Sequence, residues 1–309
     1  MEYLIYKFFG NEAGRPCSKD TVGGRFLFVN NDKMVAKKPC FPIAFCEKLL
    51  YNGNKLWVEV WLLAKIIAFV SGKGGTGKTS VCAAMATDLA LTGKKVLCID
   101  CAVGLPNLDI PLGMEGEGCL SFQEVCRGEY ATTQATVHPH FPHLQLLTAP
   151  IHCTPEEIDD DAFAAMLASA GERFDYILLD VPAGIGSMFR LAAENADRCL
   201  VVTIPDPSAM RAAGRVGQEL ELMGKTDVRL IVNRVNSKML QAMKLTVDDV
   251  VDQTGLQLLG LVPVDTDVLE AAAAGKALAL FRVRGAFAAV QRITARMEGN
   301  PVKIPVRSF

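Results

Sequence analysis

A glycine-rich segment between an apolar run and a helical run constrains this chain more than any other feature. Residues 71–80 read SGKGGTGKTS, which satisfies the pattern GxxxxGK followed by Ser or Thr. Glycines let backbone N–H groups surround phosphate oxygens, and a helix that follows them directs its positive end at the same anion. The sequence therefore predicts a phosphate-binding loop, with a strand before it and a helix from Lys78 onward.

The chain after residue 63 repeats one pattern, in which a short apolar run and a turn precede a longer helical stretch. Most of these runs are apolar throughout, which is typical of strands covered on both faces. We therefore predict an α/β fold with a doubly wound, mostly parallel sheet and helices on both faces. The predicted strands span residues 65–70, 95–100, 144–148, 175–180, 199–204, 228–233 and 258–262. The predicted helices span residues 78–91, 155–170, 187–196, 208–222, 247–253, 266–274 and 285–297.

Residues 1–63 lack this pattern. They mix glycine, proline and scattered aromatic residues without a sustained period, and they carry no motif that we can attach to chemistry. Two interpretations stay open: an N-terminal extension of unknown role, or a misassigned start, with the native protein beginning at Leu63 or Ala64. We predict that residues 64–298 form the main domain and that residues 299–309 form a tail.

Composition restricts the partners and the compartment. The formal net charge is −2 at pH 7, so the basic excess of non-specific DNA binders is missing and a DNA partner is not expected. The ten cysteines are irregularly spaced, which indicates reduced thiols in a cytoplasmic protein. Cys98 and Cys101 should point to opposite faces of a strand rather than form a pair. No apolar run is long enough to cross a bilayer.

The glycine-rich loop supplies most of the predicted nucleotide site. Lys78 is expected to contact the terminal phosphates, and the Thr79 hydroxyl can bind Mg²⁺, which prefers oxygen ligands. Asp180 ends an apolar run and is placed to hold a magnesium-bound water. The predicted cofactors are therefore a nucleotide and Mg²⁺. The predicted phosphate-binding residues are Gly72, Gly74, Gly75, Thr76, Gly77, Lys78, Thr79 and Ser80.

A second lysine, Lys73, makes the run KGGTGKTS resemble the deviant Walker A motif of the MinD/ParA family of ATPases, and most closely its MinD members. Residues 100–109 resemble the first switch of those proteins, and residues 180–184 resemble the second. The resemblance covers residues 64–296. The residues at positions similar to the family's base-contacting positions are Asn233, Arg234, Pro263, Val264 and Asp265.

The resemblance implies an ATP-hydrolysing switch that forms a homodimer on ATP binding. Lys73 would reach the partner's nucleotide, and the Gly184 N–H would sense the γ-phosphate. Such proteins position the cell-division site or a related apparatus through protein partners. ParA-type partition ATPases, flagellar-number regulators and iron–sulfur carriers are the alternatives within the resemblance, although the paired cysteines expected of a carrier are not evident.

The first switch departs from the family pattern at Ala102. The MinD pattern has Asp-x-Asp there, and its second carboxylate is thought to orient or activate the attacking water. A methyl group cannot accept a proton or hydrogen-bond a water. Either Asp100 takes over this role, or the protein hydrolyses slowly and works mainly in its ATP-bound form. We favour slow but detectable hydrolysis, and a non-hydrolysing binding module is the other hypothesis.

The C-terminal segment also departs from the family, whose MinD members end in a basic amphipathic helix. Two prolines, Pro301 and Pro305, oppose a continuous helix in the tail. Before the tail, residues 287–297 carry an apolar stripe at helical spacing, with Arg292 and Arg296 beside it. We predict a helix docked on the core, so membrane-surface binding is doubtful, and peripheral attachment to the inner face of the cell membrane stays an alternative to a purely cytoplasmic location.

Three histidines cluster in a proline-containing turn at His138, His140 and His143. No acid or cysteine lies close in sequence to complete a metal site. We therefore predict a solvated loop at this place.

Overall fold

The computed structural model describes residues 29–30, 33–34, 45–51, 54–60 and 64–305, and the chain divides into two compact units between Leu63 and Ala64. The first unit contains two antiparallel strand pairs, which the sequence analysis did not predict. The strands of this unit are β1 (Val29–Asn30), β2 (Lys33–Met34), β3 (Phe45–Tyr51) and β4 (Asn54–Val60).

The second unit is built on an eight-stranded sheet with the order β12-β11-β10-β5-β9-β6-β8-β7. Neighbouring strands are parallel except for β7, which runs antiparallel to β8. The predicted doubly wound, mostly parallel α/β sheet is therefore confirmed. The strands are β5 (Lys65–Val70), β6 (Val96–Asp100), β7 (Thr136–Val137), β8 (Leu144–Leu147), β9 (Tyr176–Asp180), β10 (Arg198–Thr203), β11 (Val228–Val235) and β12 (Gln257–Pro263).

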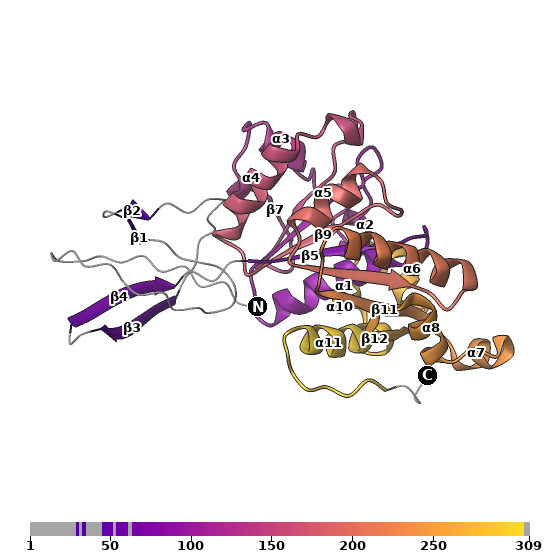
Figure 1. The fold of residues 1–309 in the computed structure, drawn as a ribbon. Coiled ribbons are helices and arrows are strands. Elements are labelled where there is room, and N and C mark those ends of the chain that lie inside the picture. Colours follow the sequence, from indigo (N-terminus) through magenta and orange to yellow (C-terminus); the bar gives the residue numbers. More distant parts are fainter. Residues whose placement is uncertain (1–28, 31–32, 35–44, 52–53, 61–63, 306–309) are drawn as a thin grey trace. The chain divides into compact units, whose positions relative to one another are not determined.

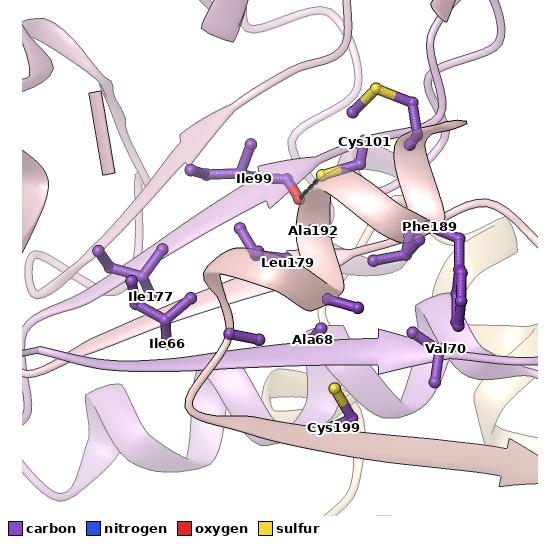
Figure 2. Close-up of a cluster of buried hydrophobic side chains, with 14 of the residues drawn as sticks. Ile66, Ala68, Val70, Ile99, Cys101, Ile177, Leu179, Phe189, Ala192 and Cys199 are labelled. Carbon is purple, nitrogen blue, oxygen red and sulfur yellow. Dashed lines mark hydrogen bonds between the residues drawn. The ribbon is translucent and has the colours of Figure 1, made fainter. Parts of the chain in front are cut away.

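Helices cover both faces of this sheet (Figure 1). The sheet therefore separates the buried core into two clusters, one on each face. On β5, Ile67 and Phe69 face the cluster of α1 and α11, whereas Ala68 and Val70 face the cluster of α4, α5, α6 and α8. Figure 2 shows part of the second cluster, where Phe189 of α5 packs near Val70. The helices are α1 (Lys78–Leu91), α2 (Asp109–Leu112), α3 (Phe122–Cys126), α4 (Asp160–Gly171), α5 (Ser187–Asn195), α6 (Pro207–Leu222), α7 (Ser237–Met243), α8 (Val247–Thr254), α9 (Asp267–Ala273), α10 (Leu278–Phe281) and α11 (Gly285–Met297).

The predicted elements are all present. The differences are missed short elements, one late helix start, and one or two residues at the ends of several strands and helices. α1 and α11 have the predicted bounds. The helix predicted over residues 155–170 begins later, because Ile158 is extended and the Asp159 carboxylate caps the new start by accepting from the Ala162 N–H at 2.8 Å. In the second unit the sequence analysis missed five short elements, namely α2, α3, β7, α7 and α10.

The docked helix predicted near the C-terminus is confirmed, because Phe287, Val290, Ile293 and Met297 of α11 are buried. Arg296 fastens the following segment: it donates to the Leu259 carbonyl at 2.6 Å and to the carbonyls of residues 302 and 303. Residues 299–305 contain no helix. Within the described residues, no helix has the length and apolar character needed to cross a membrane.

The prediction that Cys98 and Cys101 point to opposite faces is confirmed. They are buried in different core clusters, on opposite faces of the sheet.

The prediction of a solvated histidine loop is wrong in one part. His140 and His143 are exposed as expected, but His138 is buried. Its Nε2 lies 2.8 Å from the Leu112 carbonyl and its Nδ1 accepts from the His140 N–H at 3.0 Å, so backbone groups satisfy the ring without solvent. No group of three or more metal-binding side chains occurs in the described part of the chain.

Candidate nucleotide-binding and switch site

The strand order places the glycine-rich loop at the point of the sheet where ligands of doubly wound folds bind. β5 lies between β10 and β9, so the chain winds away from it in both directions, and the loop follows its carboxyl end. Two glycines are required by their surroundings. A side chain at Gly77, whose φ is +82°, would overlap the Asn233 side chain, and one at Gly72 would overlap the backbone of α6. The loop therefore packs closely against β11 and α6.

Lys78 and Asp180 form a buried ion pair at the centre of this site. The Lys78 Nζ lies 2.6 Å from the Asp180 Oδ1, and both residues are buried. Among the described residues, the other carboxylate oxygen of Asp180 and the Thr76 hydroxyl are buried without a hydrogen-bond partner. Buried polar atoms normally have partners, so this centre is built to receive further polar groups.

The donors around this centre suit a nucleotide with a divalent cation. The Lys78 Nζ lies 3.5 Å from the Thr79 hydroxyl and 2.6 Å from the Asp180 carboxylate, so it contacts both groups. Hydroxyl and carboxylate oxygens are the ligands that Mg²⁺ prefers, and a lysine at this place neutralises phosphate. The residues present therefore fit Mg²⁺, with Thr79 and Asp180 as the groups that would hold it.

Asp100 lies beside Asp180 on the neighbouring strand, in direct register with it. One of its oxygens accepts from the Ala102 N–H at 2.8 Å, and the other accepts from Asn107 and Leu108 at 2.7 Å and 2.9 Å. Burial raises the pKa of the Asp100 carboxyl, and the Asp180 charge adds to this effect. Asp100 thus holds the loop of residues 101–108, and both of its oxygens are occupied.

Ala102 lies at the start of this loop with its N–H bound to Asp100. Its methyl side chain brings no acceptor to the edge of the sheet where Asp100 and Asp180 meet. Gly104 continues the loop with a φ of +85° and donates its N–H to the Pro150 carbonyl at 2.8 Å. The loop of residues 101–108 is therefore fastened by hydrogen bonds of its backbone, and position 102 brings no carboxylate.

Lys73 and Gly184 each form hydrogen bonds with other residues of the chain. The Lys73 Nζ lies 2.7 Å from the Ser208 hydroxyl and 3.3 Å from the Asp206 carboxylate, at the start of α6. The pKa of Asp206 is lowered, first by the Ala209 N–H and further by Ser208 and Lys73. The Gly184 N–H donates to the Ser71 carbonyl at 2.8 Å. Lys73 is half exposed, so its contacts exchange readily with others.

The predicted base-contacting residues lie at the ends of β11 and β12. The Asn233 side chain donates to the Thr76 carbonyl at 2.8 Å, which joins β11 to the phosphate loop. Arg234 has a φ of 52° and donates its N–H to the Asn233 side chain. Both Asp265 oxygens accept backbone N–H groups, from Asp267 at 3.0 Å and from Ala286 at 2.8 Å. Asn233 and Arg234 are thus close to the phosphate loop, whereas Asp265 fastens α9 and α11.

The structure brings in three residues that the sequence analysis did not select, Ser71, Asp206 and Ser208. The run Asp206-Pro207-Ser208 can be read as a helix start, because an aspartate before a proline is a common N-cap. No local pattern indicates its contact with Lys73, which lies more than 130 positions earlier in the chain.

The family comparison identifies the domain. Residues 67–278 match the model of the CobQ/CobB/MinD/ParA nucleotide binding domain. The septum site-determining protein MinD of Synechocystis is 35% identical over 243 residues, which cover 77% of this chain and 91% of that protein. The protein of the same name from Thermotoga maritima is 36% identical over 217 residues, covering 69% and 80%.

Solved structures give the same result. The MinC:MinD cell division protein complex of Aquifex aeolicus contains a chain that is 33% identical, with a TM-score of 0.71, covering 78% of this chain and 98% of that one. MinD of Pyrococcus horikoshii in complex with Mg-ADP has a TM-score of 0.65, with 76% and 96% covered, and at 23% identity it shows the shared fold.

Proposed function

The chain belongs to the CobQ/CobB/MinD/ParA nucleotide-binding family as a MinD-like ATPase of division-site positioning, and we propose that it binds MgATP and works as a homodimer. The buried Lys78–Asp180 pair carries this proposal, because the second carboxylate oxygen of Asp180 has no hydrogen-bond partner within the described part of the chain. The loop residues, with Lys78, would bind the phosphates, and Asn233 and Arg234 would lie beside the base. The same residues would bind the ADP product.

In this proposal Lys78 exchanges Asp180 for the terminal phosphates when ATP binds. The Asp180 carboxylate would then be free to hold a magnesium-bound water, and the Thr79 hydroxyl would supply a direct oxygen ligand. The bound ion would supply positive charge against the terminal phosphates. Gly184 would have to leave the Ser71 carbonyl for its N–H to reach the γ-phosphate, so this backbone hydrogen bond is the proposed switch.

A homodimer is supported by the surface around the first switch. Leu105, Ile151 and Ile185 are exposed, with Leu105 at 80% and Ile151 at 62%, and they follow the adjacent strands β6, β8 and β9. Exposed apolar side chains that gather at one edge mark an interaction surface. Lys73 would leave Ser208 and Asp206 to reach the partner's nucleotide, a move that requires no buried bond to break.

Hydrolysis is proposed to be slow. Position 102 has no carboxylate, and Asp100 is committed to three backbone N–H groups. The phosphate clamp and correct positioning still contribute to catalysis. A second candidate function follows from the same observation: an ATP-dependent binding module that signals without rapid turnover.

The protein partners are proposed to be components of a division or related positioning system, recruited by the ATP-bound dimer. DNA is not an expected partner, because the formal net charge of −2 lacks the basic excess of non-specific DNA binders. We propose a cytoplasmic location, with peripheral attachment to the inner face of the cell membrane as the alternative. The carbonyls of residues 302 and 303 accept hydrogen bonds from Arg296 of α11.

We further propose that residues 64–298 carry the function. For residues 1–63, the intact mass of the native protein distinguishes a translated extension from a start at Leu63 or Ala64.

Steady-state MgATP hydrolysis at several concentrations of the full chain tests the proposed function. Specific activity that rises with protein concentration, and that falls in Lys73→Ala without loss of ATP binding, supports a dimer-activated ATPase. ATP binding and dimerisation without hydrolysis support the binding module. Failure of the wild-type chain to bind ATP contradicts both functions.

A further inference from the structure

The two edges of the eight-stranded sheet differ in how much strand they present. β7 ends one edge and has only two residues, whereas β12 ends the other edge and has seven. β12 contains no charged side chain, and Leu259, Leu261 and Val262 within it are buried. An apolar strand of this length at an edge can pair with another chain unless charges, a bulge or a covering segment prevents it. β12 therefore needs protection that the short β7 does not.

A bulge in β12 and the side chain of Arg296 form a fixed point at this edge. The register of β12 with β11 shifts at Leu259, which is the extra residue of the bulge. The Arg296 Nε donates to the Leu259 carbonyl at 2.6 Å. A side chain at Gly260 would overlap the Arg296 guanidinium, so this glycine leaves room for the contact. The bulge and the glycine thus place a guanidinium group against the outermost strand.

The same guanidinium group holds the segment that follows α11. The chain turns back after α11 (Figure 1), and the Arg296 Nη1 donates to the carbonyls of residues 302 and 303 at 3.4 Å and 3.3 Å. α11 belongs to the core cluster on one face of the sheet, whereas Ile304 packs against the cluster on the other face. Residues 299–305 therefore pass β12, the last strand, between the two faces.

We propose that residues 300–305 are a strap that covers the β12 edge, and that release of this strap lets β12 pair with β12 of a second copy of this chain. Pro301 and Pro305 have no N–H to donate, so the strap covers the edge without offering a new one. A second copy is the occupant that fits, because two identical uncharged strands can pair antiparallel across a two-fold axis. The formal net charge of −2 opposes such association little.

This contact is separate from the homodimer of the proposed function. That dimer requires ATP and uses the surface of Leu105, Ile151 and Ile185, which follow β6, β8 and β9. β12 lies on the other side of β5 from these three strands. Self-association is therefore measured without nucleotide, by sedimentation velocity at several protein concentrations. Hydrogen exchange resolved by residue locates the contact. Because ATP binding is not part of either readout, failure of the proposed function would leave this test unchanged.

Two variants release the strap to different extents. Deletion of residues 301–309 removes it, and Ile304→Gln weakens its packing in the full-length chain. Lys303→Gln is the matched control, because that side chain is exposed and the contact with Arg296 is made by the backbone carbonyl. A second copy must displace the strap before it can pair. The deletion should therefore lower the dissociation constant of self-association about tenfold or more, the effect of one charged hydrogen bond. Ile304→Gln should lower it by less, and the control should behave as the wild type does.

A further variant tests whether the contact is β12 itself. Leu258→Lys, added to the deletion, places a charge on a half-buried side chain of β12 and should restore the monomer. The β12 amides of the deletion variant should become more protected from exchange as its concentration rises. Urea unfolding of each variant separates loss of the fold from release of the strap, and if the deletion variant does not fold, Ile304→Gln decides the test.

Three results would overturn the proposal. The first is that the folded strap variants stay monomeric wherever the wild type does. The second is association that persists with Leu258→Lys, and the third is concentration-dependent protection that lies outside β12.

Discussion

The phosphate-binding centre and the loop of residues 101–108 are neighbours at the carboxyl edge of the sheet, but they are built differently. The centre is a buried ion pair of Lys78 and Asp180, whose positions are fixed by α1 and by the central strand β9. The loop is held by the Asp100 carboxylate and by single backbone hydrogen bonds, and most of its residues are at least partly exposed.

The comparison separates nucleotide binding from nucleotide hydrolysis. The centre has a lysine and a carboxylate whose chemistry fits phosphate and Mg²⁺, and both residues are buried. The loop is held by backbone hydrogen bonds, but it has Ala102 at the position of the second aspartate in the MinD pattern Asp-x-Asp. Substitutions in the centre should therefore abolish binding, whereas substitutions in the loop should change turnover or local order with little effect on affinity.

The largest expected effect is that of Lys78→Ala. Loss of a charged contact to the phosphates should lower ATP affinity by about 100-fold, the equivalent of roughly 3 kcal/mol. The change also leaves Asp180 buried without its cation, which should lower the free energy of unfolding by about 3–5 kcal/mol. Fluorescent ATP titration and urea unfolding measure the two effects. Lys73→Ala is the control, and ATP affinity equal in the two variants would contradict a special role for the buried centre.

The next effect tests the loop. Ala102→Asp should raise the rate of ATP hydrolysis by about 10- to 100-fold, since a positioned general base contributes in this range. Ala102→Asn is the matched control, because it has nearly the same size and cannot accept a proton. ATP affinity should change little in either variant. Equal turnover in the wild type and the aspartate variant would show that position 102 does not limit hydrolysis.

Asp100→Asn tests whether this carboxylate holds the loop. The amide has one acceptor oxygen for the three N–H groups now bound, so the amides of Asn107 and Leu108 should exchange with solvent about tenfold faster, near the worth of one hydrogen bond. The free energy of global unfolding should change less than this local protection does. Burial and the Asp180 charge already oppose ionisation of Asp100 and raise its pKa. Hydrogen exchange resolved by residue measures this effect. Unchanged protection at Asn107 and Leu108 would show that other contacts order the loop.

The same contrast explains how much of the molecule could be predicted from the sequence. The phosphate loop, the strand before it and α1 were predictable because motif and hydrophobic period lie in one continuous segment. The confirmed parallel sheet follows from the repeat of such segments. The contacts of Lys73 with Ser208 and of Asp100 with the loop are polar contacts of side chains that only the folded chain brings together, so no periodic pattern indicates them. The prediction that the His138 ring is solvated was wrong, because the sequence does not show that the Leu112 carbonyl lies within hydrogen-bond distance of the ring.

The smallest expected effect concerns α2, which continues from the loop and is fastened by His138. Burial lowers the pKa of His138, and its Nδ1 accepts the His140 N–H, so the folded protein prefers the neutral ring. The other groups that face the ring are His140 and Glu117. Above the unfolded pKa of about 6.5 this preference is fully present. As pH falls below it, the unfolded chain takes up a proton that the folded chain resists, so stability is lost as pH falls toward the folded pKa.

The loss should be on the order of 1 kcal/mol, the worth of the His140 hydrogen bond that protonation removes. Urea unfolding between about pH 7.5 and 5.5 measures it. His138→Gln keeps an acceptor and a donor without titrating, so the difference between the two proteins isolates the histidine from buried carboxylates such as Asp88 and Asp197, whose pKa values burial raises. The same slope in both proteins would mean that α2 is not fastened by a titrating group. In that case the order of α2 depends on uncharged contacts, in contrast to the preceding loop, which the Asp100 carboxylate holds.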